Sequence, residues 1–483
     1  MKVLSVVSEV YPLIKTGGLA DVAGALPAAL SAEGVEVATL VPGYPAVMNA
    51  IENVAPIYWM DELFGGPATV LSAEAAGLQL FVIEAKHLYD RPGGPYVSPA
   101  GVDWADNAFR YAALARVAAQ IAYGEVAGFV PDVVHAHDWQ AGLVPAFLRY
   151  DGRRHAPSVI TVHNLAFQGQ FPASIRPALG LPAHAFSLDG VEYYGMIGYL
   201  KAGLAIADRI TTVSPTYASE IRSVEGGMGL SGLLTARGSD LVGILNGIDD
   251  EVWNPQTDPS LPQRFALNSR VKRTANKAEL QRRLGLEEAP DRLLYGVVSR
   301  LSWQKGIDLL AQALPHLIAS GAQLALVGSG DDAIQQAFTL AASAHPGSVG
   351  TFYGYDENLA HLVQAGVDSL IVPSRFEPCG LTQLCALRYG ALPLVARVGG
   401  LADTIIDANE MARQAGIGTG VQFAPVTQRA LETGLDRMAE IWRDQTTWNQ
   451  LQKNAMKTDV SWRGPAKHYA ALYREIAGLR AGG

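Results

Sequence analysis

The residues best suited to chemistry lie in short segments that follow an apolar run and precede an Ala- and Leu-rich stretch. The first segment is residues 15–21, Lys-Thr-Gly-Gly-Leu-Ala-Asp. Gly17 and Gly18 let the backbone approach a ligand, and a helix beginning here offers unpaired N–H groups to an anion beside Lys15. The glycine spacing is that of neither a dinucleotide fingerprint nor a Walker A loop. The segment predicts an anion contact or, alternatively, a tight turn with a surface lysine.

Two further segments of the first half place polar side chains where apolar strands should end. They are His135-Ala-His137-Asp138 and Thr-Val-His163-Asn164. Open α/β sheets bind ligands at the carboxyl ends of their strands, so these side chains are candidates for contact with a sugar. Satisfied core histidines are the alternative. A metal site would need a third ligand at suitable spacing, which the sequence does not offer.

The second half repeats the arrangement with charged residues. Arg300 and Lys305 follow a strand and precede a helix, which favours a clamp for a diphosphate; a solvated basic turn is the alternative. Glu377 is followed by Pro, Cys379, Gly380 and Leu381, a rigid loop in which a helix amino end can meet phosphate while the carboxylate faces a sugar. The alternatives are a structural ion pair for Glu377 and a nucleophilic Cys379, although no histidine adjoins that cysteine.

The elements that must position these segments alternate as strands and helices, which predicts parallel sheets covered by helices. Strands are expected at residues 3–7, 35–41, 78–84, 133–136, 158–163, 294–298, 323–327, 349–352, 369–372 and 392–396, with helices at 20–31 and 105–123. A Pro-, Asn- and Asp-rich connection at about 246–281 separates the two halves. The predicted fold class is α/β, with two Rossmann-like doubly wound domains facing one another across a deep cleft.

The expected domains are residues 1–245 on the acceptor side and 246–460 on the nucleotide-sugar side. Residues 461–483 form a helical pattern that we expect to pack back on the first domain. Because Lys15 belongs to the first domain and Arg300, Lys305 and Glu377 belong to the second, we expect the domains to close over the donor.

Composition excludes several classes of protein. The 483 residues are 49% hydrophobic and 17% charged, as in globular proteins, and a net charge of −9 without a basic run argues against nucleic-acid binding. The two cysteines give no disulfide framework or zinc pattern. No apolar run reaches the roughly 18 residues of a membrane span, and the opening segment is typical of a strand rather than a signal peptide. We expect a cytoplasmic protein.

Together these segments closely resemble the bacterial and plant glycogen and starch synthases, which are retaining glucosyltransferases of the two-Rossmann (GT-B) type. The resemblance spans nearly the whole chain and rests on residues 15–19, 137–139, 246–249, 300–306 and 377–380. It implies a hexosyltransferase that moves glucose from ADP-glucose to the non-reducing end of an α-1,4-glucan such as glycogen, with retention of configuration and without a cofactor.

The resemblance also implies roles for residues. It assigns Lys15, Arg300 and Lys305 to the donor phosphates, and His163, Asp138 and Glu377 to the transferred sugar. Tyr355 is similar to the residue that stacks on the base. Substrate contacts are further implied for Gly17, Gly18, Asn164, Asn246, Cys379, Gly380 and Leu381.

The charges of the reaction agree with this assignment. Cations must face the departing diphosphate and electron-rich groups must face the anomeric carbon. No convincing second carboxylate accompanies Glu377, which fits departure and attack on the same face of the sugar without an enzyme nucleophile. No Asp-x-Asp pair is present to hold a metal, so we expect a metal-independent reaction. Other two-Rossmann sugar transferases, a glucan phosphorylase and a two-lobed sugar-binding protein are the alternative functions.

Overall fold

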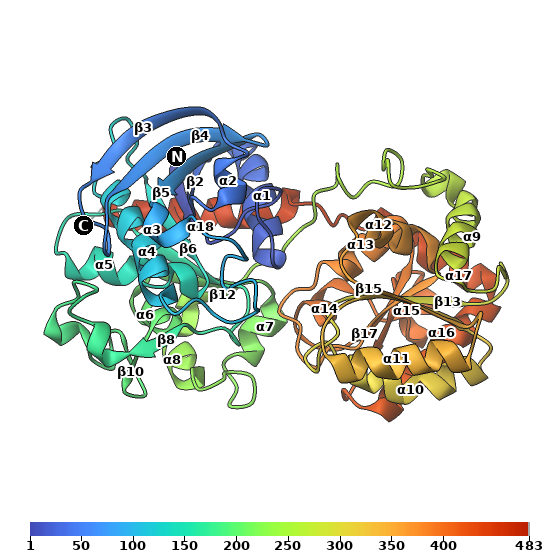
Figure 1. Cartoon of the computed structure of the whole chain (residues 1–483). Helices are drawn as coiled ribbons and strands as arrows, with labels where there is room; N and C mark the ends of the chain where they lie inside the picture. The colour runs from blue at the N-terminus through green and yellow to red at the C-terminus, as the bar shows by residue number, and fades with distance from the viewer. Residues whose placement is uncertain (482–483) are drawn as a thin grey trace. The chain divides into compact units, whose positions relative to one another are not determined.

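The computed structural model describes residues 1–481, and internal contacts divide the chain into two units. Unit 1 comprises Met1–Asn246 together with the chain from Trp462 onward, and unit 2 comprises Gly247–Ser461. Each unit is an α/β fold built on its own sheet (Figure 1). The predicted α/β class with two doubly wound domains is confirmed.

The sheet of unit 1 has nine strands in the order β12-β11-β7-β6-β1-β2-β5-β4-β3. Seven of them run parallel: β1 (Lys2–Val6), β2 (Glu36–Pro42), β5 (Leu78–Glu84), β6 (Val133–His137), β7 (Ser158–Val162), β11 (Arg209–Thr212) and β12 (Leu241–Gly243). Most of their apolar side chains are buried, as expected for strands covered on both faces, whereas Val242 of the edge strand β12 is exposed. All five strands predicted in this half are present, with ends shifted by at most one residue.

The other strands of unit 1 are absent from the sequence-based expectation. β3 (Glu52–Met60) and β4 (Ala68–Ala75) pair antiparallel at one edge of the sheet, and β8 (Gln170–Pro172), β9 (Glu192–Tyr193) and β10 (Met196–Gly198) form a separate small sheet. Residues of β3 are mostly exposed, and the strand contains Pro56, so it lacks the apolar run that marks a central strand.

Helices complete unit 1. They are α1 (Gly18–Ser31), α2 (Pro45–Met48), α3 (Lys86–Tyr89), α4 (Asn107–Ala122), α5 (Val144–Tyr150), α6 (Tyr199–Ile206), α7 (Pro215–Glu220), α8 (Ser231–Ala236) and α18 (Arg463–Ala481). α18 packs on α1 and β6, where Trp462, Tyr469 and Tyr473 join an apolar cluster with Leu26 and Leu30. The last helix of the chain thus belongs to the core of unit 1.

The sheet of unit 2 has six parallel strands in the order β15-β14-β13-β16-β17-β18. They are β13 (Leu294–Val298), β14 (Gln323–Gly328), β15 (Val349–Tyr353), β16 (Ser369–Val372), β17 (Leu392–Ala396) and β18 (Val421–Phe423). α12 (Glu357–Gly366) and α13 (Thr382–Tyr389) lie on one face, and α10 (Ile307–Ala319) and α11 (Asp332–Ala344) lie on the other (Figure 1). The remaining helices are α9 (Arg273–Arg283), α14 (Gly399–Thr404), α15 (Glu410–Ala415), α16 (Gln428–Arg443) and α17 (Gln445–Lys457).

The predicted connection at 246–281 is too long, because α9 begins at Arg273. Its sequence, RTANKAELQRR, has few apolar residues, so hydrophobic periodicity does not reveal it. The helix instead buries polar side chains, among them Arg273, Lys277 and Gln281.

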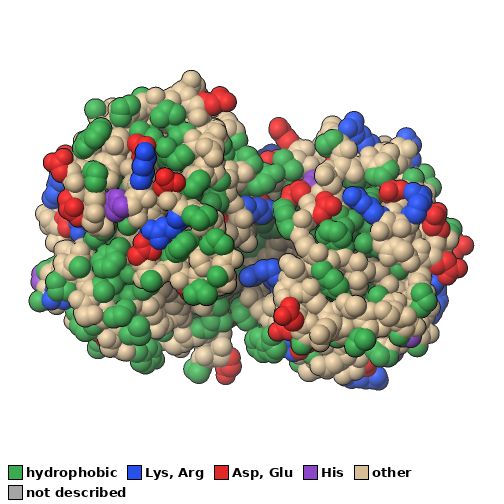
Figure 2. All heavy atoms as spheres, viewed as in Figure 1, with side chains coloured by type: hydrophobic (Ala, Val, Ile, Leu, Met, Phe, Trp, Pro, Cys, Tyr) green, Lys and Arg blue, Asp and Glu red, His purple; other side chains and the backbone are tan. Residues whose placement is uncertain are grey.

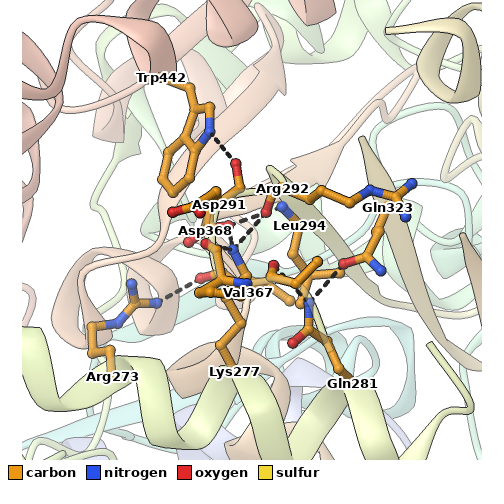
Figure 3. Close-up of polar contacts among 12 residues, drawn as sticks. Arg273, Lys277, Gln281, Asp291, Arg292, Leu294, Gln323, Val367, Asp368 and Trp442 are labelled. Atoms are coloured by element: carbon orange, nitrogen blue, oxygen red, sulfur yellow. Dashed lines mark hydrogen bonds and ion pairs between the residues drawn. The ribbon is translucent and has the colours of Figure 1, made fainter. Parts of the chain in front are cut away.

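Most polar atoms of these side chains find partners at the amino ends of the strands (Figure 3), although Arg273 Nε has none among the described residues. Lys277 Nζ lies 2.7 Å from Asp368 Oδ2 and donates to the carbonyl oxygens of Pro290 and Arg292. Asp368 also accepts a hydrogen bond from the backbone N–H of Leu294, the first residue of β13. The cluster therefore fixes α9 to β13 and β16 at the edge of the sheet opposite the predicted site residues.

Candidate functional site

In unit 1, three histidines form a row at the carboxyl ends of β6 and β7. β6 continues to His137, so His135 and His137 share one face, with ring centroids 4.0 Å apart. The next ring, that of His163, stacks on His137 at 5.2 Å, and His137 Nδ1 lies 2.9 Å from His163 Nε2. Burial lowers the pKa of both His135 and His163 to about 3, so the row is neutral at pH 7.

Asp138 joins the two loops that follow β6 and β7. Its Oδ1 accepts a hydrogen bond from the backbone N–H of His163 at 2.7 Å, and the N–H of Asn164 also donates to its carboxylate. Burial raises the pKa of Asp138 to about 7, although these two hydrogen bonds oppose the shift. Its φ of 55° and ψ of −169° form a backbone conformation found mainly in glycine, so the surrounding structure holds Asp138 in a strained conformation. The structure thus brings together Asp138, His163 and Asn164, as the sequence predicts.

The segment with Lys15, Gly17 and Gly18 lies between β1 and α1, and Gly17 is the N-cap of α1. Lys15 Nζ forms an ion pair with Asp21 at 2.8 Å and lies 5.2 Å from the centre of the Tyr11 ring. Lys15 is therefore paired at the amino end of the helix while it remains accessible to solvent.

Sequence reasoning missed Glu9, which anchors this segment. Glu9 is 3% exposed, and its carboxylate accepts hydrogen bonds from the Thr16 backbone, from Thr16 Oγ1 at 3.0 Å and from the Tyr96 hydroxyl at 3.0 Å. Burial raises its pKa despite these bonds. A carboxylate directly after the first strand was the available signal, since polar side chains there lie at the sheet edge.

In unit 2, Lys305 and Glu377 are paired. Lys305 Nζ lies 2.8 and 2.6 Å from the two oxygens of Glu377, and Ser374 Oγ donates to the same carboxylate at 2.8 Å. The side chain of Glu377 is 8% exposed and that of Lys305 is 19% exposed. The ion pair weighed for Glu377 in the sequence is therefore present, and its partner is another predicted site residue.

Close backbone crossings hold the loops of unit 2 together. Gly306 has φ 67°, and a Cβ there would overlap the carbonyl oxygen of Pro373. The N–H of Gly400 donates to the carbonyl oxygen of Glu377 at 3.0 Å, and a Cβ at Gly399 would overlap the same oxygen. Gly399 and Gly400, at the start of α14, are site-forming residues that motif reading missed. The Gly-Gly pair after β17 was the signal.

The remaining predicted residues occupy varied positions. Arg300 is exposed and forms no ion pair within residues 1–481, whereas Tyr355 is 75% exposed on the loop between β15 and α12. Asn246 is buried, and its Oδ1 has no hydrogen-bond partner in the described part of the chain. Cys379 is buried, Gly380 has φ 73°, and Leu381 caps the amino end of α13.

No broad basic surface is visible on the face of each unit drawn in Figure 2. On the face shown in Figure 2, Lys and Arg side chains are interspersed with Asp and Glu on each unit. Among residues 1–481, no three His, Cys, Asp or Glu side chains are grouped as metal ligands, and no helix is long and apolar enough to cross a membrane.

Two doubly wound α/β units, with polar and charged loops at the carboxyl ends of their strands, define the class of two-domain glycosyltransferases. The family descriptions that match are the starch synthase catalytic domain, over residues 2–236, and glycosyl transferases group 1, over residues 278–458. The chain belongs to the glycogen synthase family.

Relatives agree over the full length. The chain is 61% identical to a glycogen synthase of Rhodopseudomonas palustris, covering 99% of this chain and 98% of that one. It is 60% identical to a glycogen synthase of Methylocella silvestris, covering 99% of each. The catalytic domain of starch synthase IV from Arabidopsis thaliana, bound to ADP and acarbose, superposes with a TM-score of 0.89 at 30% identity over 99% of each chain.

A more distant likeness concerns the fold alone. Sucrose-phosphate synthase from Thermosynechococcus elongatus has a TM-score of 0.59 at 17% identity over 99% of each chain. The full-length relatives and the family descriptions confirm the predicted family and the assignment as a glucosyltransferase. The solved structures confirm the fold class.

Proposed function

We propose that this glucosyltransferase uses ADP-glucose and extends the non-reducing end of an α-1,4-glucan with retention of configuration. The observation that carries the choice of nucleotide is the likeness to a starch synthase bound to ADP. The glycogen synthases at about 60% identity support glycogen as the acceptor.

In this proposal, unit 1 supplies groups that contact both the donor phosphates and the transferred sugar. Lys15 and the amino end of α1, with Gly17 and Gly18, offer positive potential to the donor phosphates. His163, Asp138 and Asn164 surround the transferred glucose. Because the carboxylate of Asp138 accepts hydrogen bonds from the backbone N–H groups of His163 and Asn164, it sets the direction in which His163 faces the sugar.

Unit 2 supplies charge for the leaving diphosphate. Arg300 has an unpaired guanidinium within the described chain, so it is available to phosphate oxygens. Lys305 shares its charge between Glu377 and the diphosphate, which fixes the ammonium before the donor binds. Tyr355 stacks on the base; Asn246, Cys379, Gly380 and Leu381 line the substrate contacts.

The pairing of Glu377 also supports the proposed stereochemistry. Both carboxylate oxygens are hydrogen-bonded to Lys305, and one of them also accepts from Ser374. A carboxylate held in this way is a weak nucleophile, because its negative charge is already stabilised. This supports departure and attack on one face of the glucose without a covalent intermediate.

The test offers purified protein ADP-glucose and UDP-glucose separately, each with a glycogen primer, and measures nucleotide release. We expect primer-dependent release of ADP at a rate well above that of UDP. A preference for UDP-glucose, or release that does not depend on the primer, would reject the proposal. Arg300→Ala protein is the matched control, because it should fold and yet release little ADP.

A further inference from the structure

A continuous hydrogen-bonded path leads from the first strand to His163. Ser5 Oγ on β1 lies 3.3 Å from His137 Nε2, and His137 Nδ1 lies 2.9 Å from His163 Nε2. Ser5 is 6% exposed and His137 is 1% exposed, so bulk solvent has little access to this path. The only ring nitrogen of His163 left for a ligand is therefore Nδ1.

The tautomers of the two rings are coupled through this path. A neutral imidazole carries one N–H, so each ring donates from one nitrogen and accepts at the other. If His137 donates from Nδ1, then His163 accepts at Nε2 and carries its proton on Nδ1. If His163 donates from Nε2 instead, then His137 must donate from Nε2 toward Ser5, and His163 Nδ1 becomes an acceptor.

Ser5 decides between the two arrangements. Its Oγ has no second hydrogen-bond partner among residues 1–481. If the Ser5 hydroxyl accepted a hydrogen bond from His137 Nε2–H, its own buried O–H would have no acceptor, and an unmade buried hydrogen bond is costly. When Ser5 donates to His137 Nε2, each hydrogen bond along the path has one donor and one acceptor, and only the Nδ1–H of the partly exposed His163 is left for a ligand.

His135, which lies next to His137 in the row, and its partner Tyr473 support this arrangement. The ring of His135 lies against that of His137, with centroids 4.0 Å apart, and His135 Nδ1 lies 2.7 Å from the hydroxyl of Tyr473 on α18. Burial keeps the pKa of His137 well below its ordinary value, so the ring stays neutral and the coupling is preserved. Among the described side chains, no carboxylate is hydrogen-bonded to a ring of the row, and Asp138 accepts from the backbone N–H groups of His163 and Asn164 instead.

We propose that Ser5 is a positioning residue that, through His137, fixes His163 as the Nδ1–H tautomer and so presents a hydrogen-bond donor to an oxygen of the transferred sugar. The identity of the acceptor as a sugar oxygen rests on the proposed function. The tautomer itself does not, because it follows from the packing of unit 1.

The direct test is nuclear magnetic resonance of protein labelled with ¹⁵N-histidine, in which imidazole ¹⁵N shifts distinguish the two tautomers. The His163 signals are assigned by their loss in His163→Asn protein. We expect the Nδ1–H form in the unmodified protein, a mixture of both forms in Ser5→Ala, and recovery of the Nδ1–H form in Ser5→Thr. Threonine keeps the hydroxyl, and a small cavity lined by Ser5, Val22 and Leu26 adjoins this position.

An activity measurement complements the spectra. We expect Ser5→Ala to lower kcat by about 5- to 10-fold, the effect of one lost hydrogen bond, with KM changed less than about 2-fold. Ser158→Ala is the matched control, because it removes a buried serine hydroxyl at the amino end of β7, where it bonds Asp208.

Each outcome bears on the inference. An Nε2–H tautomer of His163 in the unmodified protein, or an unchanged tautomer in Ser5→Ala, would overturn it. If Ser5→Ala failed to fold, the spectrum of the unmodified protein would still decide. If the tautomer were as expected but no glucose were transferred, the proposed function would fail and the inference would stand.

Discussion

Lys305 and Glu377 occupy one site yet were expected to have separate tasks, one on the phosphates and the other on the sugar. Their contact at 2.6 to 2.8 Å means that removing either side chain leaves the other charge without its partner. Arg300, in contrast, is exposed and unpaired in the described chain, so its removal alters only the ligand's surroundings. Substitution of Lys305 should therefore lower the stability of the protein more than substitution of Arg300.

We expect Arg300→Ala and Lys305→Ala each to lower kcat by about 10²- to 10³-fold, with a smaller rise in KM for the donor, because the charges matter most as the diphosphate departs. Steady-state kinetics with ADP-glucose measure this. Thermal melts should show a normal profile for Arg300→Ala and a modest loss for Lys305→Ala, since only the latter leaves a carboxylate unpaired. Near-normal kcat with weaker donor binding would instead limit the pair to ground-state binding.

Asp138→Asn should change how stability depends on pH. The pKa of Asp138 is about 7 in the folded protein and about 3.9 when unfolded, so the folded state binds the extra proton between these values. The free energy of unfolding therefore falls as pH rises through this window, by at most about 1.4 kcal/mol per pH unit. Asparagine keeps an acceptor oxygen in a side chain of the same size and does not ionise, so the variant lacks this pH-dependent loss of stability.

Denaturant unfolding at pH 5 and pH 8 makes the comparison. The variant should gain stability relative to the unmodified protein between the two values. The buried histidines titrate in both proteins, so the difference isolates Asp138. A constant difference across this range would show that Asp138 is ionised at its ordinary pKa.

At the residue scale, the sequence predicts the site residues that stand in recognisable motifs. It does not reveal the residues outside those motifs that orient or anchor them through hydrogen bonds. His163, Asp138, Lys305 and Glu377 stand in recognisable segments. Ser5, on β1, orients His163, which lies 158 residues further along the chain. Glu9, after the end of β1, anchors Thr16, 7 residues further along. Hydrogen bonds between strands that are distant in sequence leave no local pattern to read.

At the scale of elements, the loops of unit 2 depend on glycines where backbones cross. Gly306→Ala should destabilise the protein by about 3 kcal/mol or more, from the positive φ and the overlap with Pro373, and should lower activity because Lys305 is adjacent. Gly285→Ala is the matched control, with φ 68° and open space around its Cβ, and should cost only about 1 to 2 kcal/mol.

Chemical denaturation of both variants measures the difference. Equal losses would show that the crossing at Pro373 relaxes without cost. A stable but inactive Gly306→Ala protein would separate loop geometry from stability and would contradict the coupling described for the two loops.

The elements predicted from sequence are those with long apolar runs. β13, β14, β16 and β17 are buried throughout, or nearly so, and their positions follow from hydrophobicity alone. β3 and α9 were missed for the opposite reason: one is an exposed edge strand, and the other buries charged side chains that only the tertiary partners satisfy. The sequence pattern alone does not name those partners.

At the scale of the whole molecule, a net charge of −9 must coexist with binding of an anionic donor. Local cations and helix ends resolve this, because they act at short range while distant charges are screened. We propose that they also replace a divalent metal. Exhaustive EDTA treatment should therefore leave the rate of glucose transfer unchanged, and loss of activity that Mg²⁺ or Mn²⁺ restores would contradict this view.

The most direct test of the account follows the glucose itself. ADP-glucose labelled with ¹³C at the anomeric carbon is incubated with the protein and a short α-1,4-glucan, and the product is examined by nuclear magnetic resonance. The account predicts that the label appears in an α-1,4 linkage at the non-reducing end, with ADP released in equal amount. A β-linked product, label at the reducing end, or free glucose without incorporation into the glucan would contradict it.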